Sequence, residues 1–219
     1  MRQLAIIDYG SGNLHSVQQS VCRVADAQSD EWQVITTSNA SDLSNSDAII
    51  LPGVGHFKHC RENLEQLQDM EQALINRVEH MAVPFLGICV GMQLMATTGH
   101  EGKPMAGLDW IAGEVHPLKP TKDNKERALK IPHMGWNQVS FTQSSHPITA
   151  NLTDNQYFYF VHSFHFIPTH NINCIAITEY GQSVTAMIAK DNKIGTQFHP
   201  EKSQKAGLNL LAGFMQWRA

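Results

Sequence analysis

Short apolar runs alternate with amphipathic stretches through the first hundred residues of the chain. Four of these runs have the length of strands and lie at residues 4–7, 32–36, 47–51 and 83–88. Helical periodicity, with apolar residues three and four positions apart, follows the first, third and fourth runs, and its longest stretch covers residues 57–81. Nearly continuous apolar strands that alternate with helices are typical of a parallel sheet covered on both faces. This half therefore predicts an α/β fold.

The pattern changes from about Gly107 onward. Short apolar segments separated by Gly, Pro, Asn and Ser predict strands at residues 111–118, 138–142, 157–166, 173–179, 185–190 and 194–198. A final helix capped by Ser203 is also predicted. No long linker, repeat or low-complexity segment separates the two halves. We therefore expect a single domain over residues 1–219, with a central, mostly parallel sheet flanked by helices and an antiparallel β-rich second half.

The predicted strand at residues 83–88 leads into a cysteine. Gly87 and Gly91 flank Cys89 two positions away on each side, which is the spacing of a nucleophile elbow with a thiol in place of the hydroxyl. Glycine is needed in such a turn because neighbouring backbone crowds it. The amides that begin the following helix favour the reactive thiolate. Taken alone, the motif also fits a buried structural cysteine beside two turn glycines.

Two residues near the C-terminal end can complete the chemistry of that cysteine. His199 and Glu201 lie two positions apart, so an extended backbone would project both side chains to one side. The imidazole can take the thiol proton, and a carboxylate on its other nitrogen fixes the tautomer and stabilises the imidazolium. Such chemistry also needs an oxyanion hole, for which the amide of Val90 and the glycine turn at residues 53–55 are candidate donors.

Composition and charge narrow the functional classes. The chain of 219 residues is 42% hydrophobic and 16% charged, and its formal charge of -4 gives no drive toward nucleic acid or anionic membranes. The apolar run at the N-terminus is too short for a signal peptide, and no stretch approaches a spanning helix. Four cysteines without paired spacing indicate a reduced protein, so we expect a cytoplasmic location.

Two further clusters are weaker signals. His56, His59 and Cys60 crowd onto one predicted helix start, but no fourth ligand with recognisable spacing accompanies them, so we predict no metal site. Basic residues recur between Lys119 and Lys130, and they indicate a solvated loop, with docking of an acidic partner as the alternative.

The cysteine, histidine and glycine-turn motifs together resemble a known family. The elbow Gly-Ile-Cys-Val-Gly-Met-Gln, the late His-Pro-Glu and the turn at residues 53–55 are similar to those of class I (triad) glutamine amidotransferases, which have a flavodoxin-like α/β fold. Within that class, the chain resembles the glutaminase subunits of imidazole glycerol phosphate synthase in four motifs, at residues 8–13, 51–55, 132–137 and 161–163. The resemblance covers essentially the whole chain. It departs from the family pattern at Phe164 and His165, where tyrosines are more common, and at Val90, where leucine is common.

This resemblance implies the hydrolysis of L-glutamine to glutamate and ammonia, without a cofactor or a metal. The implied catalytic residues are Cys89, His199 and Glu201. The implied oxyanion hole uses the amide of Val90 and the peptide between Gly53 and Val54. The implied glutamine-binding residues are Gly55, Gln93 and Ser163.

The resemblance also implies a heterodimer with a separate (β/α)8 cyclase subunit. Ammonia would pass to that subunit, which makes imidazole glycerol phosphate and an aminoimidazole carboxamide nucleotide in histidine biosynthesis. Because glycine tolerates either peptide orientation, we expect the Gly53–Val54 peptide of the isolated chain to be out of donor orientation and to turn on docking. Two alternatives remain. One is an amidotransferase subunit of anthranilate, GMP or pyridoxal phosphate synthesis, against which the motif at residues 132–137 argues, and the other is a non-catalytic flavodoxin-like thiol protein.

Overall fold

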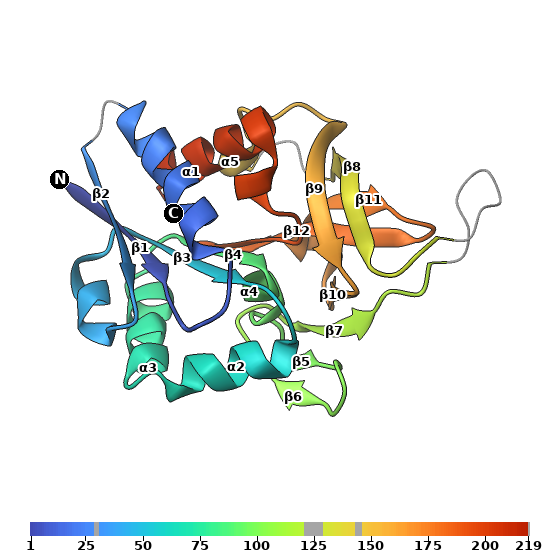
Figure 1. Cartoon of the computed structure of the whole chain (residues 1–219), viewed down its shortest axis with the longest axis horizontal. Helices are drawn as coiled ribbons and strands as arrows, with labels where there is room; N and C mark the ends of the chain where they lie inside the picture. The colour runs from blue at the N-terminus through green and yellow to red at the C-terminus, as the bar shows by residue number, and fades with distance from the viewer. Residues whose placement is uncertain (29–30, 121–128, 143–145, 219) are drawn as a thin grey trace.

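A computed structural model describes residues 1–28, 31–120, 129–142 and 146–218 (Figure 1). Within these ranges, a nine-stranded sheet has the order β2-β1-β3-β4-β13-β12-β11-β8-β9. Its strands are β1 (Arg2–Ile7), β2 (Trp32–Thr37), β3 (Ala48–Gly53), β4 (Phe85–Cys89), β8 (His133–Phe141), β9 (Gln156–His162), β11 (Cys174–Glu179), β12 (Ser183–Lys190) and β13 (Lys193–Thr196). A smaller sheet, in the order β10-β7-β5-β6, contains β5 (Thr98–Gly99), β6 (Met105–Ala106), β7 (Gly113–Pro117) and β10 (Phe164–Pro168).

The large sheet joins the two halves of the sequence. Strands β2, β1, β3, β4 and β13 are parallel, and β3 and β4 are buried along their whole length, as their continuous apolar runs predict. Strands β12, β11, β8 and β9 extend the sheet with antiparallel pairing. The predicted combination of a parallel core with an antiparallel second half is therefore confirmed, and β13 is the strand that joins them.

Helices cover both faces of the parallel strands (Figure 1). Helices α1 (Leu14–Asp26) and α5 (Gln204–Gln216) lie on one face, and α2 (Phe57–Gln66) and α3 (Met70–Leu74) lie on the other. The buried residues of α1 include Val17, Val21 and Val24, which lie three and four positions apart as helical periodicity requires. Burying each such side chain contributes about 1.5–3 kcal/mol, so packing rather than local propensity holds these helices on the sheet. No helix in the described part of the chain is long and apolar enough to span a membrane.

The single long helix predicted for residues 57–81 is wrong. It is divided into α2, α3 and a π-helical turn, η2 (Ile75–His80), and Asp69 just before α3 has a left-handed φ of 58°. Aspartate tolerates this conformation because its short polar side chain can bond locally. The break also brings Glu71 to Arg61, which is only 6% exposed, and the pair forms two hydrogen bonds of 2.8 and 3.1 Å. Helical periodicity continues across the break, which is why the pattern did not reveal it.

The single strand predicted for residues 157–166 is also wrong. Strand β9 pairs with β8 in the large sheet, whereas β10 pairs with β7 in the small one. Ser163 lies between them, and no Gly or Pro marks the change of sheet in the sequence. Most of the predicted basic loop, at residues 121–128, lies outside the described residues.

Candidate active site

Cys89 ends β4 in a backbone conformation that residues other than glycine rarely adopt. Its φ is 54° and its ψ is -109°, and the single-turn helix α4 (Val90–Gln93) starts at the next residue. A Cβ atom on Gly91 would lie 1.8 Å from the carbonyl oxygen of Leu51, so only glycine lets this turn pack against β3. The conformation is that of a strained strand-to-helix nucleophile elbow.

His199 and Glu201 form a buried pair after β13. The backbone between them is not extended as predicted, because Glu201 lies in the short 3-10 helix η5 (Pro200–Lys202). Their side chains still meet, with His199 Nδ1 2.8 Å from Glu201 Oε1, and they are only 2% and 1% exposed. The hydroxyl of Ser203 does not cap α5 as predicted. It donates instead to the carbonyl of His199 at 2.6 Å and accepts from the amide of Tyr159 at 3.0 Å, which fixes the segment to β9.

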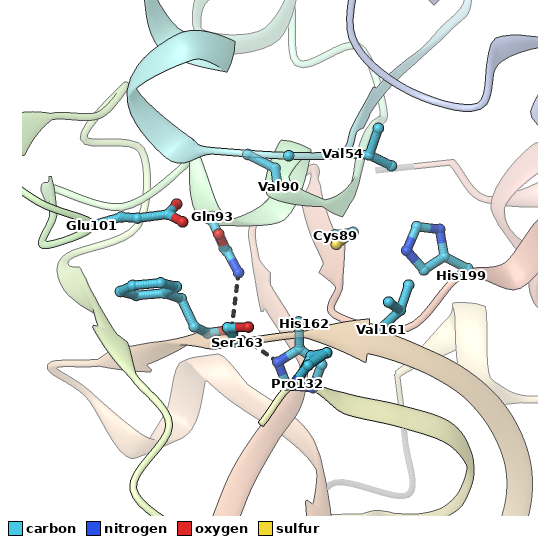
Figure 2. Close-up of a pocket in the computed structure, with 12 residues that line it drawn as sticks. Val54, Cys89, Val90, Gln93, Glu101, Pro132, Val161, His162, Ser163 and His199 are labelled. Atoms are coloured by element: carbon cyan, nitrogen blue, oxygen red, sulfur yellow. Dashed lines mark hydrogen bonds between the residues drawn. The ribbon is translucent and has the colours of Figure 1, made fainter. Parts of the chain in front are cut away.

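The other ring nitrogen of His199 is available to the nucleophile. Burial by itself lowers the pKa of His199, but interactions with the sulfur of Cys89 and the carboxylate of Glu201 outweigh it and raise the pKa to about 10. His199 Nε2 is buried and has no hydrogen bond of standard geometry among the described residues, and the ring lies beside Cys89 (Figure 2). Contacts of this kind often tighten only when a substrate binds. The arrangement favours an imidazolium next to the sulfur.

A cavity of about 280 Å³ opens beside Cys89 (Figure 2). Its lining includes seven residues that the sequence singled out, namely Val54, Gly55, Cys89, Val90, Gln93, Ser163 and His199. Gly53 and Glu201 lie behind this wall, since Gly53 is opposite Cys89 in the register of β3 and β4 and Glu201 contacts His199. Sequence reasoning did not identify Glu101, which also lines the cavity and whose carboxylate accepts from the amide of Phe57 at 2.7 Å.

The backbone at Val54 is held by Ser11, in the turn after β1. The amide of Val54 donates to Ser11 Oγ at 3.3 Å, and the hydroxyl of Ser11 donates to the carbonyl oxygen of Val54 at 2.7 Å. The thiol of Cys60 donates to the same carbonyl at 3.4 Å. The amide of Val54 is thus engaged by Ser11 in this structure.

Two buried glutamines connect the nucleophile to the far wall of the cavity. Gln93 Nε2 donates to the carbonyl oxygen of Phe164 at 3.1 Å and to Gln197 Oε1 at 3.0 Å. Gln197 is fully buried, and its Nε2 donates to the sulfur of Cys89 at 3.6 Å. Sequence reasoning missed Gln197, although a polar residue at the end of a buried apolar strand was the available signal.

The histidines of β8 and β9 have a different environment from His199. His162 lines the cavity. Its Nδ1 bonds to the carbonyl oxygen of Phe164 at 2.8 Å, and its Nε2 lies 3.0 Å from Nδ1 of His133. Burial lowers the pKa of His162 to about 3, with a further contribution from His133. Burial also lowers the pKa of His133, to about 4. Both rings are therefore neutral at pH 7. They position the wall of the cavity and do not compete with His199 for a proton.

Comparison with known families agrees with this geometry. Residues 5–216 match the family model for glutamine amidotransferase class-I. The chain therefore belongs to the class I glutamine amidotransferase family. Two solved structures share the fold. The glutaminase domain of Trypanosoma brucei CTPS has a TM-score of 0.66 and 15% sequence identity, and the match covers 100% of this chain and 96% of that one. A glutamine amidotransferase from Thermotoga maritima has a TM-score of 0.64 and 14% sequence identity, and the match covers 98% of this chain and 96% of that one.

Curated relatives place the chain more narrowly within the family. It is 45% identical over 215 residues to imidazole glycerol phosphate synthase subunit HisH of Rhodospirillum rubrum, covering 98% of this chain and 99% of the relative. It is 44% identical over 218 residues to the HisH subunit of Rhodopseudomonas palustris, again covering 98% and 99%. The chain thus lies in the HisH branch of the family, as the motifs at residues 8–13 and 132–137 predict.

Proposed function

We propose that this chain hydrolyses L-glutamine to glutamate and ammonia as the glutaminase subunit of an imidazole glycerol phosphate synthase. The observation that carries the proposal is the strained elbow that presents Cys89 to a cavity, with His199 in the same wall and Glu201 behind it, bonded to His199. Membership of the HisH branch supports the pathway, which is histidine biosynthesis.

The first half-reaction forms a thioester. The thiolate of Cys89 attacks the side-chain amide carbon of glutamine, and the negative charge moves to the amide oxygen. Collapse of this intermediate breaks the carbon–nitrogen bond, and the imidazolium of His199 gives its proton to the leaving nitrogen, which departs as ammonia. Glu201, 2.8 Å from the other ring nitrogen, holds the imidazole in orientation and stabilises its charged form.

The second half-reaction returns the thiolate. Neutral His199 takes a proton from water, and the hydroxide adds to the thioester carbon. Breakage of the carbon–sulfur bond then releases glutamate. In both halves the amide of Val90 is one oxyanion donor, and the amide of Val54 becomes the second only after it leaves Ser11. We place Gly55, Gln93 and Ser163 around the glutamine because all three line the cavity.

The ammonia product implies a second subunit. We propose a heterodimer, with this chain as one domain over residues 1–219, in which a (β/α)8 cyclase subunit uses the ammonia to form imidazole glycerol phosphate and the aminoimidazole carboxamide nucleotide. A subunit that turns over glutamine without its partner would waste substrate, and the engaged amide of Val54 is consistent with low activity of the isolated chain. We also propose a cytoplasmic location, which the four free cysteines support.

The decisive experiment separates glutamine use from ammonia use. In the complex with the cyclase subunit, Cys89→Ala should abolish glutamine-dependent synthesis and leave ammonia-dependent synthesis intact. The matched control is Cys22→Ala, which removes a free cysteine from α1 that does not line the cavity and should change neither rate. A glutamine-analogue electrophile should label Cys89 alone. Retention of glutamine-dependent synthesis by Cys89→Ala would refute the proposal.

A further inference from the structure

Three potential metal ligands gather on the small sheet, and none of them lines the active-site cavity. His100 follows β5 directly, and Glu114 and His116 lie two positions apart on β7, so their side chains share one face of the strand. Glu114 Oε2 lies 3.1 Å from His100 Nε2 and 2.8 Å from His116 Nε2. One ligand atom from each residue lies within 4.8 Å of the others. The three side chains thus converge on one point.

The spacing is close to that required by a bound ion. Zinc bonds of about 2.0–2.2 Å to nitrogen and oxygen in tetrahedral geometry separate neighbouring ligand atoms by about 3.3–3.6 Å. From the present 3.1 Å and 2.8 Å, the distance of Glu114 Oε2 from His100 Nε2 would have to open by about 0.2–0.5 Å and its distance from His116 Nε2 by about 0.5–0.8 Å. The two imidazole rings are stacked, with centroids 4.5 Å apart and planes 10° from parallel, so a modest rotation of each ring would direct its lone pair at a shared ion.

The surroundings give an ion access to the three side chains. The side chains of His100, Glu114 and His116 are 29%, 52% and 38% exposed, which leaves room for rotation and for a water ligand. Together they offer two imidazole nitrogens and one carboxylate oxygen as ligand atoms.

We propose that His100, Glu114 and His116 form a binding site for a divalent transition-metal ion of the zinc type, with water in the fourth position. Two imidazoles and one carboxylate suit Zn²⁺, Co²⁺ or Ni²⁺, whereas Mg²⁺ and Ca²⁺ prefer sites made of oxygen ligands. The site is independent of the proposed glutaminase function, since none of its ligands lines the cavity.

An ion bound here would cross-link β7 to the residue that follows β5. β5 and β7 are paired at two positions in parallel register, and two more backbone bonds of 2.9 Å flank β5, from the amide of Thr97 to the carbonyl of Gly113 and from the amide of His100 to the carbonyl of Val115. Glu101, the next residue, lines the active-site cavity and binds the start of α2. The ion would therefore restrain the segment that forms one edge of the cavity.

Binding of Co²⁺ and Zn²⁺ to the tag-free full-length chain tests the proposal. We expect one equivalent of Co²⁺ to give visible absorption bands of a four-coordinate ion, and Zn²⁺ to displace it. Competition with a chromophoric chelator should give a zinc affinity at least tenfold weaker in His116→Ala and in Glu114→Gln than in the unmodified chain. His170→Ala, which removes an exposed histidine outside the cluster, is the matched control and should bind as the unmodified chain does.

Two results would overturn the proposal. One is equal zinc affinity in the unmodified chain and in the double variant His100→Ala/His116→Ala, which would mean adventitious binding elsewhere. The other is saturation by Mg²⁺ at the same concentration as by Zn²⁺. Because the three side chains are partly exposed, the variants should keep the melting temperature of the metal-free chain, so a loss of folding cannot imitate a loss of ligands.

Discussion

Replacing Ser11 by alanine should raise the glutaminase rate of the isolated chain. The hydroxyl of Ser11 engages both backbone polar groups of Val54, the amide at 3.3 Å and the carbonyl at 2.7 Å. Alanine removes both interactions and leaves the amide without its acceptor in the present orientation. The peptide between Gly53 and Val54 should then turn more easily toward the cavity, where its amide can stabilise an oxyanion.

The size of the effect follows from the bond to the amide of Val54, because the carbonyl of Val54 belongs to the next peptide, which need not turn. This bond contributes a net of about 0.5–1.5 kcal/mol, and its loss changes the balance between the two orientations of the Gly53–Val54 peptide by that amount. At about 1.4 kcal/mol for each factor of ten, the population of the donor orientation should rise about 2- to 12-fold. The carbonyl of Val54 keeps a partner, because the thiol of Cys60 still donates to it at 3.4 Å.

Steady-state glutamate production by the isolated chain measures this change directly. The basal kcat of Ser11→Ala should rise by the predicted factor. The rate of the complex with a liganded cyclase subunit should change less than twofold, since we propose that docking turns the peptide in both chains. Ser38→Ala, at an exposed serine in the described part of the chain, is the matched control. An unchanged basal rate in a folded Ser11→Ala chain would show that this serine does not hold back the peptide.

Three other substitutions test the triad and its support. Glu201→Gln should lower kcat/KM of the complex by about 10²–10⁴. It should also weaken the pH dependence of the free energy of unfolding, which urea unfolding at several pH values would reveal. The pKa of His199 is raised to about 10, against about 6.5 in the unfolded chain, and this adds stability that is complete below pH 6.5 and is lost as the pH rises through 10. Gln197→Leu should lower kcat/KM by about 10-fold or more by removing the amide donor to the nucleophilic sulfur, with an unchanged far-UV spectrum, and wild-type kinetics would contradict that role. Gly91→Ala should abolish activity or soluble expression, because the new Cβ would lie 1.8 Å from the carbonyl oxygen of Leu51, and a fully active variant would show that the elbow can move.

Local patterns predicted most of the fold. Continuous apolar runs identified β3 and β4 at the centre of the parallel core, because a strand buried on both faces leaves a simple signature. Two of the errors, at Asp69 and Ser163, occur where tertiary contacts override a pattern that continues unbroken. The pairing of Arg61 with Glu71 depends on a break that neither residue signals in the sequence.

The site was predictable only where spacing constrains the chemistry. The glycines around Cys89 and the short separation of His199 from Glu201 imply a turn and a pair without any knowledge of the fold. The hydrogen bonds between Ser11 and Val54 join residues that are 43 positions apart in the sequence, and no periodicity predicts contacts between residues so far apart. Such contacts depend on which loops meet at the ends of neighbouring strands, and that follows from strand order.

Strand register explains why Cys89 and His199 lie close together. β4 and β13 are adjacent and parallel, with Ile88 opposite Thr196, so the next residues on the two strands, Cys89 and Gln197, leave the sheet side by side. Their side chains accordingly touch at 3.6 Å, and His199 follows two residues later at the same carboxyl edge, where ligands of doubly wound sheets bind. A slip of one residue between these strands would turn Gln197 away from the sulfur and carry His199 out of the wall of the cavity. The geometry of the candidate site therefore depends on the pairing of two strands that lie more than a hundred residues apart in the sequence.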